Sequence, residues 1–171
     1  MKKALVPFLI KEPHNGKDFN VSTELIHDRY NLEDRKIADI LKKVKTIALI
    51  GASEKPERDS YKVMAFLINE GFQVFPINPL LAGKTIMNQK VYACLADLPT
   101  PIDMLDVFRQ SKYLYDIVVE AKQANITTIW TQLGVTDAKA ELLARESGIT
   151  MVVDRCPAIE IPQLALKNNS A

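Results

Sequence analysis

TIALIGASEKPERDSYKVM, residues 46–64, joins an apolar run, a glycine, a short polar loop and an amphipathic stretch. A short apolar run bounded by a glycine predicts a buried strand, and the residues after the loop predict a helix. A strand, a glycine loop and a helix open a dinucleotide-binding fold. Gly51 is the loop's one glycine, however, where the NAD fingerprint has three. The stretch therefore predicts a nucleotide-binding α/β domain and leaves the nucleotide open.

Strand-like and helix-like patterns alternate along the rest of the chain. Apolar runs predict strands at 46–51, 72–79, 102–109, 126–134 and 149–155, with a short candidate strand at 91–95 after a turn-rich stretch at 81–90. Amphipathic periodicity predicts helices at 60–71, 111–125 and 136–148. Such alternation is typical of parallel strands joined by right-handed crossovers. The predicted fold class is a three-layer, doubly wound α/β domain with a mostly parallel sheet.

Helix ends can also be predicted from residue type. Ser60 and Thr136 are candidate N-caps, because a hydroxyl oxygen accepts a hydrogen bond from the first helical turn. Gly71 is placed for a left-handed C-terminal cap. The helix at 111–125 has one apolar face, formed by Leu114, Ile117, Val118 and Ala121.

The first 45 residues do not follow this alternation. Asn31 can cap a helix at 31–45, whose basic last turn suits the negative end of the helix dipole. Residues 1–30 show little periodicity and are too short for a core of their own. We interpret them as an extension that packs on a single domain at 31–171, with a separate functional module as the alternative.

Composition limits the classes of partner. The 171 residues carry 22 Lys and Arg against 21 Asp and Glu, which argues against a nucleic-acid-coating role. The two cysteines, Cys94 and Cys156, are too few for a disulfide framework and fit a reducing compartment. The start lacks a signal-peptide cleavage site, and no apolar run has the length of a membrane span. We therefore expect a cytoplasmic protein that binds neither membrane nor nucleic acid.

Ligands of open parallel sheets bind beyond the carboxyl ends of the strands. The first loop there offers backbone N–H groups at Gly51, Ala52 and Ser53, the Ser53 hydroxyl and the following helix N-terminus. Lys55 and Arg58 add positive charge. These residues are candidate phosphate contacts, and an ordinary βα turn with a solvated charge cluster is the alternative.

The second strand ends in Asn78 and Pro79. An NAD-binding domain places an Asp or Glu near this position to bind the ribose diol, so that acidic group is missing. An uncharged edge tolerates a ligand with an additional phosphate. A plain strand-terminating turn is the alternative interpretation of both residues.

Two later loops complete the predicted crevice. Phe108 could lie against an adenine and Arg109 could bind phosphate bidentately, although a core phenylalanine and a solvated arginine are equally consistent with the pattern. Gln132 and Gly134 follow the next strand and are expected to face the same crevice. Trp130, inside that strand, is expected in the core.

Catalytic groups are scarce in the α/β body. Both histidines, His14 and His27, precede it, and no nucleophile elbow, P-loop or paired metal ligands occur. Asp103 and Asp106 resemble a carboxylate pair, but residues three apart on a strand face opposite sides, so we expect caps or ion pairs. Cys156 is the best nucleophile candidate, with Arg155 beside it to lower its pKa, but inert packing is the preferred interpretation. We predict no catalytic residue and no metal site.

Together these segments resemble a known family. From about residue 34 to residue 164 the chain is similar to small stand-alone coenzyme A-binding proteins, themselves similar to the N-terminal CoA-binding domain of the succinyl-CoA synthetase alpha subunit. The motifs that carry the resemblance are GAS at 51–53 with Pro56 and Arg58, VFPINP at 74–79, LDVFR at 105–109, WTQLGV at 130–135 and DRCPAIE at 154–160.

The resemblance implies a Rossmann-like domain. It would hold CoA or acyl-CoA through the phosphates at the Gly51 loop and through the adenosine near Asn78 and Phe108. Two positions depart from the pattern: Leu80 stands where the synthetase has a lysine, and Asn88 stands where the stand-alone family usually has glycine. The synthetase's phosphorylated histidine belongs to a second domain, so the ligase activity is not implied.

Three functions are consistent with the sequence. The leading hypothesis is non-catalytic binding of CoA or acyl-CoA, as a sensor or carrier that displays an altered surface to a protein partner. The second is an NAD(P)- or CoA-dependent enzyme that uses the same crevice through Cys156 or the Arg109 loop. The third is an interaction module with a vestigial pocket, whose helix at 31–45 faces another protein.

Overall fold

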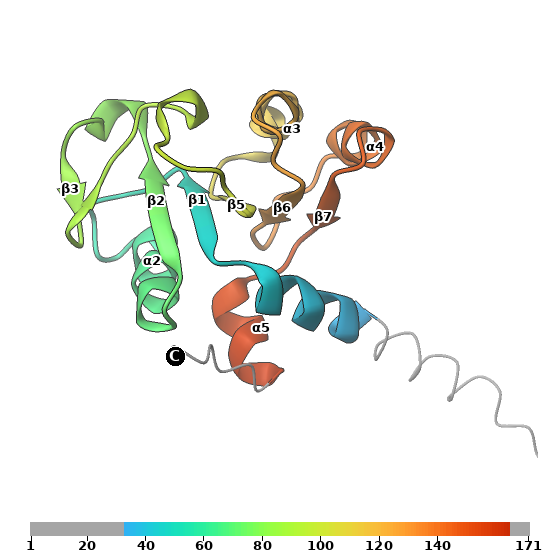
Figure 1. The fold of residues 1–171 in the computed structure, drawn as a ribbon, viewed down its shortest axis with the longest axis horizontal. Helices are drawn as coiled ribbons and strands as arrows, with labels where there is room; N and C mark the ends of the chain where they lie inside the picture. The colour runs from blue at the N-terminus through green and yellow to red at the C-terminus, as the bar shows by residue number, and fades with distance from the viewer. Residues whose placement is uncertain (1–32, 165–171) are drawn as a thin grey trace, which may run out of the picture. The chain divides into compact units, whose positions relative to one another are not determined.

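A five-stranded parallel sheet forms the centre of the computed structural model, which describes residues 33–164 (Figure 1). The strands are β1 (Thr46–Ile50), β2 (Gln73–Ile77), β5 (Met104–Val107), β6 (Thr128–Thr131) and β7 (Thr150–Val152), in the order β2-β1-β5-β6-β7. Ile50 is in register with Ile77 on one side and with Val107 on the other. The carboxyl ends of the three neighbouring strands β2, β1 and β5 are therefore level.

Helices cover both faces of the sheet, which confirms the doubly wound, three-layer prediction (Figure 1). One face carries α3 (Leu114–Gln123) and α4 (Ala138–Glu146). The other carries α2 (Asp59–Asn69), α5 (Pro157–Gln163) and the helix of residues 33–43. A separate buried apolar cluster lies under each helical layer. The predicted apolar face of α3 is confirmed, because Leu114, Ile117, Val118 and Ala121 are all buried.

Two predicted N-caps are wrong, and one C-cap is confirmed. Arg58 is the N-cap residue of α2, and Ser60 lies buried inside the first turn. Asp137 caps α4 in place of Thr136, because its carboxylate accepts a hydrogen bond from the Ala140 N–H at 2.8 Å. Gly71 has a φ of 90°, the left-handed conformation expected after α2.

The predicted strand at 91–95 is wrong. Only Tyr92 pairs there, in a single parallel bridge with Ile77. The turn-rich stretch before it contains a two-stranded hairpin, β3 (Thr85–Ile86) with β4 (Gln89–Lys90). Its turn residues Met87 and Asn88 both have positive φ, at 49° and 62°. Asparagine tolerates this conformation, so Asn88 keeps the tight turn that a glycine would allow.

The helix α5 was not predicted from the sequence. Pro157 lies in its first turn, where a proline loses no helical hydrogen bond. Three single-turn 3-10 helices complete the described secondary structure: Pro79–Leu81, Leu95–Asp97 and Ser111–Tyr113.

The first described helix ends at residue 43, two residues before the predicted end at 45. Asp103 explains this difference. Its carboxylate accepts hydrogen bonds from the backbone N–H groups of Lys45 at 2.8 Å and Thr46 at 2.9 Å, which directs the chain into β1. Asp103 therefore caps the strand, as predicted. The predicted cap Asn31 and the extension at 1–30 lie outside the described residues.

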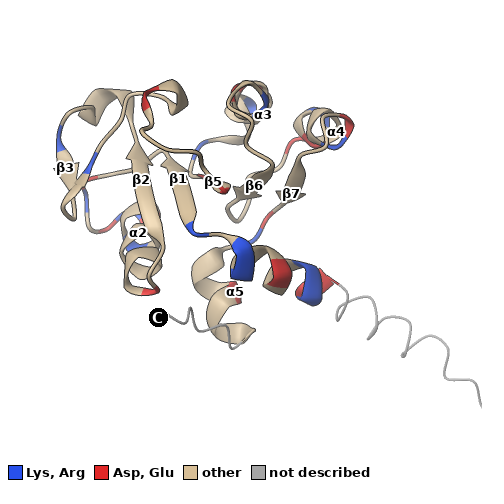
Figure 2. Ribbon diagram, viewed as in Figure 1, with Lys and Arg blue, Asp and Glu red and all other residues tan. Residues whose placement is uncertain are grey.

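Charges of both signs are interspersed along α4 and the helix of residues 33–43 (Figure 2). Within the described part of the chain, no helix is both long and apolar enough to span a membrane.

Candidate functional site

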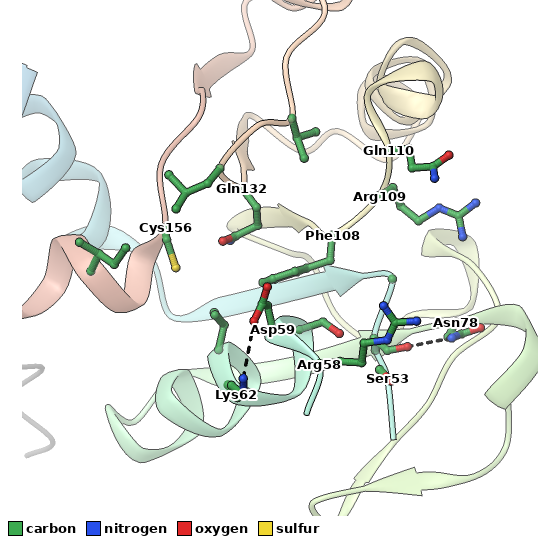
Figure 3. Close-up of a pocket in the computed structure, with 17 residues that line it drawn as sticks. Ser53, Arg58, Asp59, Lys62, Asn78, Phe108, Arg109, Gln110, Gln132 and Cys156 are labelled. Atoms are coloured by element: carbon green, nitrogen blue, oxygen red, sulfur yellow. Dashed lines mark hydrogen bonds and ion pairs between the residues drawn. The ribbon is translucent and has the colours of Figure 1, made fainter. Parts of the chain in front are cut away.

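The switch point of the sheet lies between β1 and β5. The chain leaves β1 for β2 on one side and later returns to β5 on the other, and ligands of open α/β sheets bind where the strand order reverses in this way. A cleft of about 840 Å³ opens here, lined by loops that follow all five strands and by the first turns of α2 and α5 (Figure 3). Its volume is in the range of small-molecule sites.

Most of the predicted ligand contacts come together in this cleft. Eight of them line it: Gly51, Ala52, Ser53, Arg58, Asn78, Phe108, Arg109 and Gln132. Pro79 lines an adjacent cavity of about 290 Å³, which shares Gly51, Asn78 and Arg109 with the cleft. Lys55 and Gly134 line neither cavity. That any of these residues binds a ligand stays a prediction.

The Gly51 loop is held tightly against its neighbouring strands. A β-carbon on Gly51 would lie 2.3 Å from the carbonyl oxygen of Phe108, and the residue has a φ of +87°. Only glycine fits a position that combines this close approach with left-handed backbone.

The predicted backbone donors of this loop are wrong at two positions. The N–H groups of Gly51 and Ala52 both donate to the carbonyl of Ile77, at 3.0 and 3.2 Å, so they hold the loop on β2 and do not point at an anion. Ser53 keeps its role as a candidate donor. Its side-chain oxygen accepts from the Lys55 N–H at 3.2 Å, which leaves the hydroxyl proton free to be donated.

Two arginines give one end of the cleft its positive charge. Arg58 and Arg109 are both exposed and lie close to Ser53 and Asn78 in Figure 3. The Arg109 guanidinium stacks over the Tyr113 ring at 4.5 Å, which orients it without neutralising it. Lys62 also lines the cleft, but it pairs with Asp59 at 3.8 Å.

Asn78 ties two of the loops together. Its amide nitrogen donates to the Ala52 carbonyl at 2.8 Å, and its amide oxygen accepts from the Leu80 N–H at 2.9 Å. These contacts agree with the alternative interpretation of Asn78 as part of a strand-terminating turn. Leu80, which replaces the synthetase lysine, is 89% exposed and lines neither cavity.

A buried carboxyl group lies behind the cleft. Asp106 is completely buried in β5, and one of its oxygens accepts from the Gln132 amide at 2.6 Å, while the other has no partner among the described residues. Burial raises the pKa of Asp106 to about 7, although hydrogen bonds from Gln132 and the Val107 backbone act to lower it. The expectation of a cap or ion pair is wrong for Asp106. The sequence does contain a signal, a single acid in the middle of an apolar strand.

Cys156 lies at the opposite end of the cleft from Arg109 (Figure 3). Burial raises the pKa of its thiol, hydrogen bonds from the Ala158 and Ile159 backbone act against this, and the nearby carboxylates of Asp106 and Asp59 add to the rise. The predicted lowering by Arg155 is wrong, because the Arg155 guanidinium pairs with Glu160 at 3.1 Å and with Asp34 at 3.7 Å. Cys156 and Cys94 are both free thiols.

The aromatic side chains follow the sequence expectations in part. Trp130 is fully buried, and its indole N–H donates to the Arg155 carbonyl at 2.7 Å, which confirms its place in the core. Phe108 packs partly against the core and also lines the cleft. Among residues 33–164, no three side chains of the metal-ligating types come together.

Comparison with known proteins identifies the family. Residues 45–162, more than half of the chain, match the family described as "CoA binding domain". The chain belongs to this CoA-binding domain family. The resemblance drawn from the motifs is thereby confirmed at the level of the family.

Several relatives match this chain over most of their own length. An uncharacterized protein of Bacillus subtilis, YneT, is 29% identical over 126 residues, which are 74% of this chain and 92% of that protein. The solved structure of cell-free ID.343 from Thermus thermophilus is 34% identical, with a TM-score of 0.74 over 77% of this chain and 98% of that one. A hypothetical protein from Pyrococcus horikoshii is also 34% identical, with a TM-score of 0.73 over 77% of this chain and 92% of that one.

A larger relative is a ligase subunit. Subunit alpha of the ADP-forming acetate–CoA ligase I of Pyrococcus furiosus is 29% identical over 90 residues, which are 50% of this chain and 19% of the subunit. Half of this chain thus matches about a fifth of that subunit.

Proposed function

We propose that this protein binds coenzyme A or an acyl-CoA in the cleft at the switch point, without turning it over, as a sensor or carrier. The observation that carries the proposal is the pair of exposed arginines, Arg58 and Arg109, at one end of a cleft of about 840 Å³ in a CoA-binding domain. The names of its relatives add support, because one of them is a CoA ligase subunit.

The charges of the cleft suit a ligand with several phosphates. CoA carries a pyrophosphate and a 3′-phosphate, and arginine binds such groups by paired, charge-assisted hydrogen bonds. Ser53 and the first turn of α2 line the same cleft and would add neutral donors and a positive dipole end. Asp59 in the first turn of α2 weakens this attraction locally and is paired with Lys62.

The end of β2 favours CoA over NAD. The strand ends at Ile77 and is followed by Asn78 and Pro79, so no carboxylate is there to bind a ribose diol. A carboxylate at this edge would repel the additional phosphate of CoA. The amide of Asn78 is engaged with backbone groups on both sides, which leaves an uncharged, rigid edge.

The environment of the candidate nucleophile in the cleft, Cys156, makes it less reactive. The Cys156 thiol has a raised pKa, so it carries little thiolate, the form that acts as a nucleophile. The Gln132 amide is bound to the buried Asp106, which lies behind the cleft wall. Both observations support binding without turnover.

Isothermal titration tests the proposal. Purified protein is titrated with CoA, dephospho-CoA, NAD and ATP, and we expect saturable binding that is selective for CoA. Arg58→Ala and Arg109→Ala should each weaken CoA binding about tenfold, the usual effect of losing a charged hydrogen-bond partner. Arg145→Ala is the matched control, because Arg145 is an exposed arginine of α4 outside the cleft.

The competing functions give different results. If Arg109 binds the 3′-phosphate, Arg109→Ala should weaken CoA more than dephospho-CoA, and equal losses would remove that assignment. Selective binding of NAD, or release of free thiol from acyl-CoA during incubation, would favour the enzyme hypothesis. Binding of no ligand would contradict the proposal and leave the interaction module.

A further inference from the structure

Two exposed apolar side chains converge on one end of the cleft. Leu133 and Ile159 are 61% and 43% exposed, and both line the cleft together with Val63 and Val135. A single exposed leucine needs no explanation, but exposed apolar side chains that gather in a concave site are typical of a ligand-binding surface.

This apolar end is the one farthest from the phosphate contacts. Leu133 directly follows Gln132, and the Ile159 N–H donates to the Cys156 carbonyl at 2.9 Å. Figure 3 shows Gln132 and Cys156 at the end of the cleft away from Arg109 and Asn78. The cleft therefore changes along its length from a cationic end to an apolar end.

The side chains that line the apolar end make it unfavourable for an anion. The Gln132 amide is bound to Asp106 at 2.6 Å, so its orientation is fixed. The side chains that form this end, Leu133, Ile159, Val63 and Val135, offer no hydrogen-bond donor to a ligand. A carboxylate placed against them would lose its hydration without gaining a partner, whereas an uncharged, apolar group would not.

We propose that the apolar end formed by Leu133, Ile159, Val63 and Val135 binds the acyl group of an acyl-CoA, and that it selects uncharged aliphatic acyl groups over dicarboxylic ones. The inference rests on the proposed function, because it needs the phosphates of CoA at Arg58 and Arg109. The thiol of CoA lies at the opposite end of the molecule from its phosphates, so a thioester bound in this direction extends toward Cys156.

The test is a titration series with CoA, acetyl-CoA, butyryl-CoA, hexanoyl-CoA and succinyl-CoA. Full burial of a methylene is worth about fourfold in affinity, and the half-exposed walls should give about twofold per methylene. Binding should therefore tighten about fourfold from acetyl- to butyryl-CoA and again about fourfold to hexanoyl-CoA. Succinyl-CoA, with four acyl carbons like butyryl-CoA, should bind about tenfold more weakly than butyryl-CoA, because its carboxylate would be desolvated against apolar side chains.

The double variant Leu133→Ser/Ile159→Ser should abolish the gain with chain length and leave the affinity for CoA unchanged. Both side chains are exposed, so the fold does not depend on their burial. Leu142→Ser is the matched control, because Leu142 is 44% exposed on α4 and does not line the cleft. This variant should keep the chain-length dependence.

The outcomes separate the two proposals. If CoA binds but affinity is flat along the series, or succinyl-CoA binds as tightly as butyryl-CoA, the acyl site is overturned and the CoA site stands. A gain that persists in the double variant also overturns it. If none of the five ligands binds, the proposed function fails and the acyl site fails with it.

Discussion

At the scale of single residues, the protonation state of Asp106, behind the cleft, affects the stability of the domain. Burial raises its pKa from 3.8 to about 7, so the folded state favours the protonated carboxyl. The stability that this group contributes is complete below pH 3.8 and is lost as the pH rises to about 7. The loss is on the order of a few kcal/mol, because a pKa that differs by one between the folded and unfolded states corresponds to about 1.4 kcal/mol.

Asp106→Asn should remove this loss. Urea unfolding between about pH 4.5 and pH 8 should show the free energy of unfolding of the wild type falling relative to that of the variant as the pH rises. The slope of the difference is the readout, because an asparagine amide also changes the hydrogen bonding behind the cleft. Equal slopes for both proteins would contradict the raised pKa.

Asp103→Asn provides a control of opposite sign. Partial burial acts to raise the pKa of Asp103, but hydrogen bonds from Thr46 and Lys45 outweigh it and the pKa lies below 3.8. A lowered pKa contributes stability above the unfolded value that is lost on acidification. Relative to this variant, the wild type should lose stability as the pH falls below about 4.

Residue-scale details were the least predictable part of the site. Gly71 could be assigned from the sequence, because left-handed backbone favours glycine whatever surrounds it. The backbone donors at Gly51 and Ala52 could not, since their partner is the carbonyl of Ile77 on a different strand. Similarly, the Cys156 thiol responds to burial and to Asp106, neither of which is visible in the neighbouring sequence.

At the scale of elements, the contact between the loop after β1 and the end of β5 builds the centre of the cleft. Gly51→Ala would place a β-carbon 2.3 Å from the Phe108 carbonyl oxygen and would also strain a backbone with φ of +87°. Gly134→Ala has a similar φ of +76° but no heavy atom within 4 Å. Comparing the two variants therefore separates the effect of the steric contact on stability from the effect of backbone strain.

Both substitutions should lower the free energy of unfolding, by different amounts. Gly134→Ala should cost roughly 1–2 kcal/mol, the strain of an alanine in left-handed backbone. Gly51→Ala should cost clearly more, because β1 and β5 must also move apart, and it should weaken CoA binding as well. Denaturant unfolding measures the first effect, and titration with CoA measures the second. Equal losses of stability would show that the loop after β1 accommodates the β-carbon without a shift of β5.

Elements were predictable where the pattern was long and local. Buried strands such as β1 and β5 have apolar runs, and α3 has a full apolar face, so their type follows from periodicity. α5 was missed because it is only seven residues long and contains Pro162. It follows Cys156 as N-cap, and it contacts α2, which is far away in the sequence. Residues 91–95 are apolar but make only one bridge, between Tyr92 and Ile77 of the edge strand β2.

At the scale of the whole molecule, the cleft depends on both helical layers. Its walls come from loops after all five strands, and the clusters beneath those strands lie on opposite faces of the sheet. The fold class follows from the alternation of strand and helix patterns along the chain. The edge of the sheet that is expected to bind ligands follows from the switch-point rule. The apolar end does not, because it needs Leu133, in the loop after β6, and Ile159, in α5, to line the same cleft.

A cleft built from every strand end should transmit ligand binding to the entire domain. At a CoA concentration about 100 times its dissociation constant, the folded state gains about 2.7 kcal/mol, which corresponds to a rise in Tm of roughly 5–10 °C for a domain of this size. Trp130 fluorescence reports the core on the α2 and α5 face, and far-UV circular dichroism also reports α3 and α4. Both signals should shift together by the same amount, and the shift should vanish in an Arg58→Ala/Arg109→Ala double variant whose ligand-free Tm is unchanged. A shift in the fluorescence alone would mean that the ligand stabilises one face of the sheet and that the two layers unfold independently.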